Sequence, residues 1–132
     1  MATTYQAQLL TPEGSRFEGQ VEGVRVPGSS GDFQMLHNHA PIVSSLGIGK
    51  IVIKQKGEKE LNFAVSGGFV EMSNNQLTIL AEKAEKSTEI DRDEALKHRD
   101  DIREKLNSLK YRSDDIETKL AIAENRLKIA ES

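Results

Sequence analysis

The stretch KIVIKQKGEKELNFAV, residues 50–65, decides how the first part of this chain folds. Apolar side chains recur at every second position on both sides of its central KGE, at Ile51, Ile53, Leu61, Phe63 and Val65. A period of two is that of a β-strand, in which successive side chains point to opposite faces. Glycine tolerates the positive φ that a tight turn requires. The stretch therefore predicts a β-hairpin.

The same alternation continues on both sides of this hairpin, at Tyr5, Ala7, Leu9, Val24, Val26, Leu77, Ile79 and Ala81. Turn residues separate the alternating segments: TPEG at 11–14, PGSSG at 27–31 and SNN at 73–75. Strands at this spacing, joined by short turns and not by crossover helices, favour an antiparallel sheet. We predict an all-β antiparallel sandwich for residues 1–86. The glycines of PGSSG and of SGG at 66–68 are interpreted as serving turns, bulges or close backbone approach, because neither cluster leads into a helix N-terminus that could bind phosphate.

Residues 87–132 carry a different pattern. Residues 88–132 hold 12 of the 21 acidic and 10 of the 18 basic side chains of the chain. Apolar side chains now recur every three or four residues, which is the period of a helix. One stripe comprises Ala95, Ile102, Leu106 and Leu109, and a second comprises Ile116, Leu120, Ala123, Leu127 and Ala130. We predict an antiparallel two-helix hairpin that packs through these stripes.

Capping residues mark where both helices begin. DRDE at 91–94 resembles a capping box, in which an Asp91 oxygen accepts from the Glu94 N–H and the Glu94 carboxylate reaches back. KYRSDD at 110–115 interrupts the pattern, and Ser113 or Asp114 can cap the second helix. So short a hairpin buries few aliphatic side chains, and the free energy gained by burying them is nearly cancelled by the conformational entropy lost on ordering the backbone. We therefore expect it to depend on the sandwich or on another subunit, and to be a rearrangeable arm.

Composition excludes several classes of function. The chain of 132 residues has a net charge of −3 and no cysteine. The charge disfavours nucleic acid as a partner, and the lack of cysteine excludes thiolate catalysis and ligation. No stretch approaches the ~20 apolar residues of a membrane-spanning helix, so we expect membrane attachment only through a protein partner. No spacing of Ser, His and carboxylate suggests a nucleophile, although such triads can be assembled from distant residues. The residues therefore disfavour an enzyme, and we predict no cofactor.

The segment GDFQMLHNHAP, residues 31–41, holds two of the three histidines. Alternation places His37 and His39 on one face of an extended segment, close enough to share a metal ion. A zinc site would need further ligands from Asp32, a glutamate or His98. A proline-stiffened loop with exposed imidazoles fits a contact surface better, so we predict interaction residues and no metal site.

Five segments, taken in order, are similar to those of a known family. They are VPGSSGDFQMLHNHAPIVSSL at 26–46, FAVSGGFVEM at 63–72, LTILAEKAE at 77–85, EIDRDEA at 89–95 and LAIAENRL at 120–127. Over essentially the whole chain, this order resembles the epsilon subunit of the F-type proton-translocating ATP synthase, which is called delta in mitochondria.

The resemblance implies a non-catalytic subunit of the rotating central stalk. In that family the sandwich binds the gamma subunit and sits on the polar loops of the membrane c-ring, so that torque passes to the catalytic head. The helices fold against the sandwich, or extend along gamma toward the alpha and beta subunits and inhibit ATP hydrolysis. Because no transit peptide is evident, the expected location is peripheral, on the cytoplasmic face of a bacterial plasma membrane.

The resemblance also implies a set of contact residues. A Gly-acid pair near the ring and a His-Ala-Pro segment are matched here, and we expect them at the c-ring and gamma interface: Gly31, Asp32, His39, Ala40 and Pro41. The family usually has Pro-Gly before that histidine. His37 and Asn38 stand there in this chain, so His37 has no assigned role.

A second departure concerns nucleotide binding. ATP-binding bacterial members resemble Ile/Leu-Asp-x-x-Arg-Ala, of which Ile90, Asp91 and Ala95 are present here, whereas the arginine is replaced by Glu94. A carboxylate repels a triphosphate. We therefore predict weak or absent regulatory ATP binding at these residues.

The residues alone leave two other functions open. The first is a free-standing β-sandwich binding module that dimerises through a coiled-coil hairpin. The second is a small metal-dependent hydrolase centred on His37 and His39. A stable homodimer would favour the first, and stoichiometric zinc that is lost on His39→Ala would favour the second.

Overall fold

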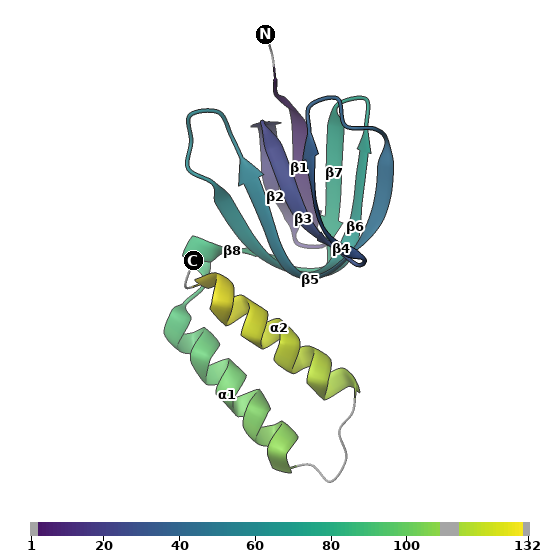
Figure 1. Cartoon of the computed structure of the whole chain (residues 1–132). Coiled ribbons are helices and arrows are strands. Elements are labelled where there is room, and N and C mark those ends of the chain that lie inside the picture. Colours follow the sequence, from purple (N-terminus) through teal and green to yellow (C-terminus); the bar gives the residue numbers. More distant parts are fainter. Residues whose placement is uncertain (1–2, 109–113, 131–132) are drawn as a thin grey trace.

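Eight strands form the first part of the chain and two helices the second (Figure 1). The computed structural model describes residues 3–108 and 114–130. The strands are β1 (Tyr5–Thr11), β2 (Gly14–Val21), β3 (Gly23–Gly28), β4 (Gly31–Leu36), β5 (Ile42–Lys54), β6 (Leu61–Ser73), β7 (Gln76–Ala81) and β8 (Ala84–Lys86). A short 3₁₀ turn, η1 (Ser87–Glu89), leads to α1 (Arg92–Ser108) and α2 (Asp114–Ala130). The predicted order, an all-β part followed by a helical hairpin, is confirmed.

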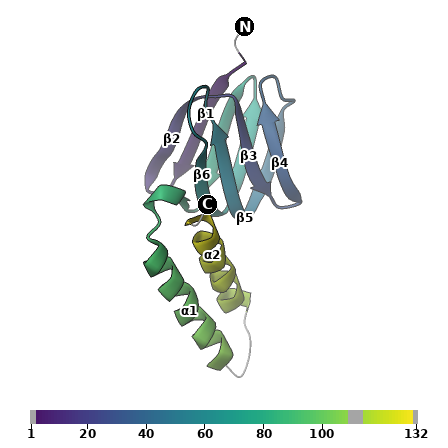
Figure 2. The ribbon, with the colours of Figure 1, turned by 60° about the vertical axis from the view of Figure 1, so that its left-hand side comes forward.

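The sandwich is one continuous sheet folded over itself. Its strand order is β2-β1-β7-β6-β5-β3-β4, with β8 paired to β6. The long strands β5 and β6 belong to both layers, because β6 pairs with β8 near its start and with β7 near its end. One layer therefore contains β1, β2 and β7, and the other contains β3, β4 and β8 (Figures 1 and 2).

One strand pair differs from the predicted antiparallel arrangement. β1 and β7 run parallel, with Leu10 opposite Leu80, while the other pairs among the described strands are antiparallel. A parallel pair needs a long connection, and here residues 12–75, which form most of the sandwich, supply it. Alternation identifies strands but carries no information about their direction.

Glycines allow the long strands to bend between the layers. In β6, Gly67 has a φ of 82° and Gly68 a φ of 132°, which favour glycine. A Cβ atom at Gly68 would clash with the carbonyl oxygen of Leu80. The interpretation of SGG as a site of close backbone approach is therefore confirmed.

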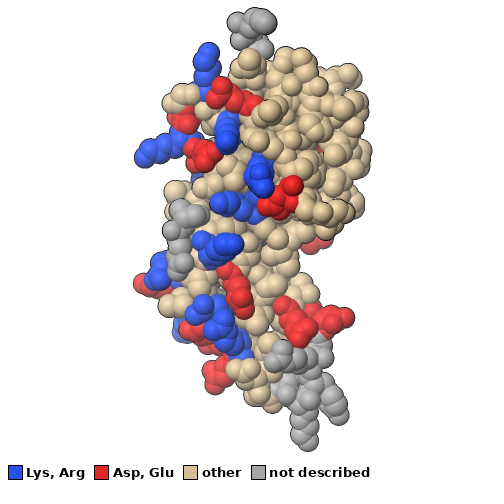
Figure 3. All heavy atoms as spheres, viewed as in Figure 1, with Lys and Arg blue, Asp and Glu red and all other residues tan. Residues whose placement is uncertain are grey.

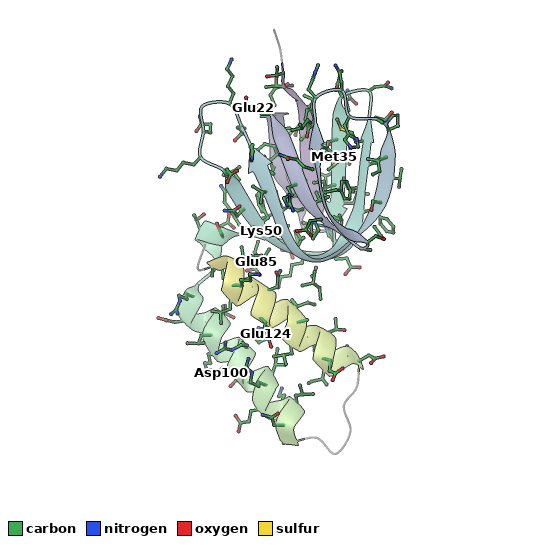
Figure 4. The ribbon with its side chains drawn as sticks, in the orientation of Figure 1. Glu22, Met35, Lys50, Glu85, Asp100 and Glu124 are labelled. Atoms are coloured by element: carbon green, nitrogen blue, oxygen red, sulfur yellow. The ribbon has the colours of Figure 1, made fainter. Side chains whose placement is uncertain are left out.

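The core lies between the two layers. Its buried side chains include the alternating residues of the sequence: Tyr5, Ala7, Leu9, Val24, Val26, Ile51, Ile53, Phe63, Val65, Leu77, Ile79 and Ala81. The Tyr5 hydroxyl, on β1, donates to the Met35 carbonyl of β4 at 2.5 Å and so links the layers. Met35 itself lies inside the sandwich (Figure 4). Burial raises the pKa of Tyr5 to about 12, so the hydroxyl remains a donor well above neutral pH.

The two helices run antiparallel below the sandwich (Figure 1). The Asp91 carboxylate accepts from the Glu94 N–H at 3.1 Å, so the predicted cap of α1 is confirmed. The Glu94 carboxylate does not reach back to the cap as the capping-box pattern predicts; it pairs with Arg126 of α2, because a cation is the stronger partner.

The helical stripes agree with the sequence pattern within the described residues. Buried members are Ala95, Ile102, Leu106, Ala123 and Leu127. Leu109 and Ser113 lie outside the described residues, and Asp114 is already the first residue of α2. Ile129, which is not on the predicted stripe, is only 2% exposed because α2 has a second buried face against the sandwich.

Candidate interaction surfaces

The first pair of predicted contact residues lies at the turn between β3 and β4. Gly31 has a φ of 131°, and apart from Gly31 and its two chain neighbours no residue has a heavy atom within 4 Å of the position that a Cβ would take. The exposed Asp32 carboxylate is 3.9 Å from the Arg25 guanidinium, and both side chains are more than half exposed, so this ion pair is weak. Asp32 also lines a hollow beside α2 with Lys50 and Lys128. The turn therefore presents a carboxylate close to the helical arm.

The other predicted contact residues, His39, Ala40 and Pro41, follow the opposite end of β4. That strand is six residues long, which at ~3.3 Å per residue separates the two sets by roughly 20 Å. The structure therefore does not bring the five predicted contact residues into one patch. They belong to two ends of the same strand.

The two neighbouring histidines do not lie on one face of an extended segment, so that expectation is wrong. β4 ends at Leu36, and His37 and Asn38 form a turn in which Asn38 has a φ of 66° and the His39 N–H donates to the Leu36 carbonyl. The positive φ reverses the chain, which breaks the alternation. In residues 3–108 and 114–130, no three metal-ligating side chains are grouped so that they could hold an ion.

Asparagine side chains join this turn to the next one. The Asn38 N–H donates to the Asn75 Oδ1 at 2.7 Å, and the Asn75 Nδ2 donates to the Asn38 Oδ1 at 2.9 Å. Asn75 belongs to the turn between β6 and β7. Both turns lie at the end of the sandwich farthest from the helices (Figure 1).

An exposed apolar row crosses the outer face of one layer. Leu10, Leu80 and Phe69 occupy directly paired positions on β1, β7 and β6. Phe69 is 61% and Leu80 53% exposed, and Val43 on β5 is 72% exposed. Leu10, Phe69 and Leu80, here called the apolar row, also line an open hollow with Pro12. Such contiguous exposed apolar side chains are typical of a protein interaction surface.

Adjacent apolar residues within a strand are a sequence signal that predicts the apolar row, and a search for alternation alone does not detect it. Each member stands next to a core residue, as in Leu9-Leu10, Phe69-Val70 and Ile79-Leu80. An adjacent apolar pair in a strand places one side chain in the core and the other outside.

Charged side chains are unevenly distributed over the surface. Lys, Arg, Asp and Glu crowd the helices and the left flank of the sandwich in Figure 3, while the right flank, where the first half of β5 runs, is nearly free of them. Val43 belongs to this half of β5. An uncharged flank next to the apolar row strengthens the case for a docking surface.

A second contact region joins the helical arm to the sandwich. α2 packs on β5 and β6, and α1 packs on α2. A small apolar cluster lies at this junction, composed of Ala64, Ile90, Ala95, Leu127 and Ile129. The Asn125 amide also donates to the Gly49 carbonyl of β5 at 2.9 Å.

Arg126 holds three elements together at the same junction. Its Nε is 2.7 Å from the Glu85 Oε1 of β8, and its Nη1 is 2.6 Å from the Glu94 Oε2 of α1. The arginine side chain is only 16% exposed, and its hydrogen bond to Glu85 raises its pKa. Figure 4 shows Glu85 where the sandwich meets α2. We call Arg126, Glu85 and Glu94 the Arg126 clamp; sequence analysis missed it because its members are far apart in the chain.

The residues that matched a nucleotide-binding pattern have structural roles here. Ile90 and Ala95 are buried in the junction cluster, and Asp91 caps α1. The cavity beside Arg126 has a volume of about 140 Å³ and is also lined by Glu85 and Glu94. Pockets for ligands of drug size start at about 300 Å³. The arginine beside this cavity is already paired with two carboxylates, an arrangement that disfavours a triphosphate, so weak or absent ATP binding stays a prediction.

Among the described residues, neither helix is both long and apolar enough to cross a bilayer.

The sandwich matches a sequence model of the family described as "ATP synthase, Delta/Epsilon chain, beta-sandwich domain" over residues 4–87. The chain is similar to the ATP synthase epsilon chain of Bacillus velezensis, with 39% identity over 132 residues that cover 96% of this chain and 97% of the relative. It is also similar to the epsilon chain of Desulfitobacterium hafniense, with 44% identity over 96 residues that cover 73% and 72%.

Solved structures with the same fold come from two ATP synthases. A chain in the Euglena gracilis mitochondrial enzyme superposes with a TM-score of 0.76 at 20% identity, over 99% of this chain and 79% of that one. A chain in the central stalk and c-ring of the Tetrahymena thermophila mitochondrial enzyme gives a TM-score of 0.61 at 16% identity, over 96% and 92%. At such identities the likeness shows the fold alone.

Proposed function

Because the chain belongs to the ATP synthase delta/epsilon family, we propose that it is a non-catalytic rotor subunit of an F-type ATP synthase. It couples proton-driven rotation of the c-ring to ATP synthesis in the catalytic head. The observation that carries this proposal is the apolar row, which offers a surface for a permanent partner.

The gamma subunit is the partner that we assign to the apolar row. Leu10, Phe69 and Leu80 stand side by side on three strands, so a rigid layer presents them together. A long-lived contact that transmits torque requires such a preorganised apolar centre. His39, Ala40 and Pro41 lie just before β5, whose first half carries Val43, and we assign them to the rim of the same contact.

The polar loops of the c-ring are assigned to the turn between β3 and β4. Gly31 leaves the tip of this turn open, and the Asp32 carboxylate is exposed beside it. A carboxylate on an exposed turn suits polar and cationic groups on a partner loop. Attachment to the ring makes the chain peripheral, on the cytoplasmic face of a bacterial plasma membrane.

The helical hairpin is assigned a regulatory role. It contacts the sandwich through α2, the junction cluster and the Arg126 clamp, and the short η1 turn connects it to β8. A small contact with a short connection allows the arm to leave as a unit. The released arm extends along gamma toward the alpha and beta subunits and inhibits ATP hydrolysis. Dimerisation through the hairpin is not favoured, because the two helical stripes already bury each other.

Binding to purified gamma tests the main assignment. Phe69→Ser and Leu80→Ser should each weaken binding by about 2 kcal/mol, or roughly 30-fold, as expected for central residues of an interface. Val52→Ser is the matched control, because Val52 points outward from the other layer, opposite Arg25 and Asn62. Wild-type affinity in both apolar-row variants, or an equal loss in the control, would contradict the assignment.

A further inference from the structure

Asn38 and Asn75 connect two turns that are distant in sequence. The pair is reciprocal, since each residue both donates and accepts one hydrogen bond, at 2.7 and 2.9 Å. The Asn75 carbonyl also accepts from the Gln6 N–H at the start of β1, at 3.3 Å. Asn75 therefore links the turn after β4 to the layer that carries the apolar row.

Both asparagines adopt backbone conformations that favour glycine. Their φ angles are 66° and 57°, and asparagine tolerates this region better than most residues do, though less readily than glycine. Glycine would form either turn, but it has no side chain with which to make the reciprocal pair. The side chains thus supply a connection that the turns themselves do not require.

The hydrogen bonds between Asn38 and Asn75 restrict the conformation of the segment that follows, residues 39–41. The His39 N–H donates to the Leu36 carbonyl, and the His39 ring nitrogen Nδ1 lies 2.6 Å from the Ala40 carbonyl oxygen. Pro41 fixes one more backbone angle. With Asn38 held by Asn75, residues 39–41 are constrained from both sides and lead into β5.

We infer that Asn38 and Asn75 are positioning residues that preorganise His39, Ala40 and Pro41 for contact with the gamma subunit. This inference rests on the proposed function. Two solvent-exposed neutral hydrogen bonds contribute little to global stability. Their effect is instead to remove the cost of ordering this segment when the partner binds.

Glycine substitutions test the side-chain hydrogen bonds of Asn38 and Asn75 without disturbing the backbone conformation of the two turns. Both Asn38→Gly and Asn75→Gly keep the positive φ angles. Asn75→Gly removes both bonds, whereas Asn38→Gly keeps the backbone N–H that donates to Asn75 Oδ1 and removes only the bond from Asn75 Nδ2. Asn74→Gly is the matched control, because Asn74 lies in the same turn with a φ of 52° and is not a member of the pair. Asn75→Asp is the conservative variant, since its carboxylate still accepts from the Asn38 N–H.

The measurements are affinity for gamma and hydrogen exchange of the free chain. Asn75→Gly should bind gamma about tenfold more weakly, and Asn38→Gly should show a smaller loss because it keeps one of the two bonds. In both variants the amides of residues 37–40 should exchange faster while core amides remain protected. Asn74→Gly should match wild type, and Asn75→Asp should recover part of the affinity. Unchanged affinity in both pair variants overturns the inference while leaving the proposed function intact. Failure of the wild-type chain to bind gamma overturns both.

Discussion

Replacing Arg126 with methionine should release the helical arm from the sandwich. Methionine keeps much of the aliphatic length of arginine but removes the charge that pairs with Glu85 and Glu94. The two carboxylates would then face each other across the junction without this cation. The remaining contacts of α2, among them the apolar cluster and the Asn125 hydrogen bond, would still hold it in place.

The size of this effect follows from the exposure of the Arg126 clamp. Exposed ion pairs contribute about 0.2–1 kcal/mol, whereas removing one partner of a fully buried pair costs about 3–5 kcal/mol. Arg126 is 16% exposed, but Glu94 is 54% exposed, which places the clamp between these limits. We expect docking of the arm to weaken by about 2 kcal/mol, a roughly 30-fold shift toward the undocked state.

Hydrogen exchange measures this shift directly. The amides of α2 that face the sandwich should exchange roughly 30-fold faster in Arg126→Met, while amides of the core strands keep their protection. Arg103→Met is the control, because it breaks the Arg103–Glu124 ion pair between the two helices, at 3.6 Å, and leaves the sandwich contact intact. Both of those side chains are about half exposed, so the control should change exchange little.

Two results would refute this reasoning. If α2 is protected in wild type and equally protected in Arg126→Met, the clamp does not hold the arm. If exchange rises equally in α2 and in the core strands, the substitution unfolds the chain and does not release the arm. In the assembled enzyme, a released arm should also lower the rate of ATP hydrolysis, as the proposed regulatory role requires.

Two further predictions concern single side chains. The pKa of Tyr5 is raised to about 12 from 10.0 by burial, so its contribution to stability is complete below pH 10 and is lost as the pH rises through 12, by about 2–3 kcal/mol. Denaturant unfolding at pH 8 and pH 11 should show this loss in wild type and a smaller one in Tyr5→Phe; the same pH dependence in both would be evidence against it. Calorimetric titration with ATP should detect no micromolar site, because Glu94 pairs with Arg126 and repels phosphate. A micromolar site in wild type would contradict the prediction. If Glu94→Ala also binds no ATP, the carboxylate is not the reason for the missing site.

The sequence alone determined the features that depend on neighbouring residues. The alternation of Ile51 with Ile53, and of Leu77 with Ile79, identified core faces, because the side-chain period of a strand is a local property. The helical stripes and the Asp91 cap were predicted for the same reason. The turns at KGE and SNN followed from the backbone freedom of glycine and asparagine.

Tertiary structure decided which distant segments meet. The parallel pairing of β1 with β7, the pairing of Phe69 with Leu80, and the reciprocal bonds between Asn38 and Asn75 all depend on how the sheet folds over itself. Arg126 and Glu85 are 41 residues apart, and no periodicity connects them. A local pattern fixes which face of an element is apolar, but not which element covers that face or which charge lies opposite. Those choices are made by the packing of the whole chain, and they place the apolar row on the surface and the Arg126 clamp at the junction.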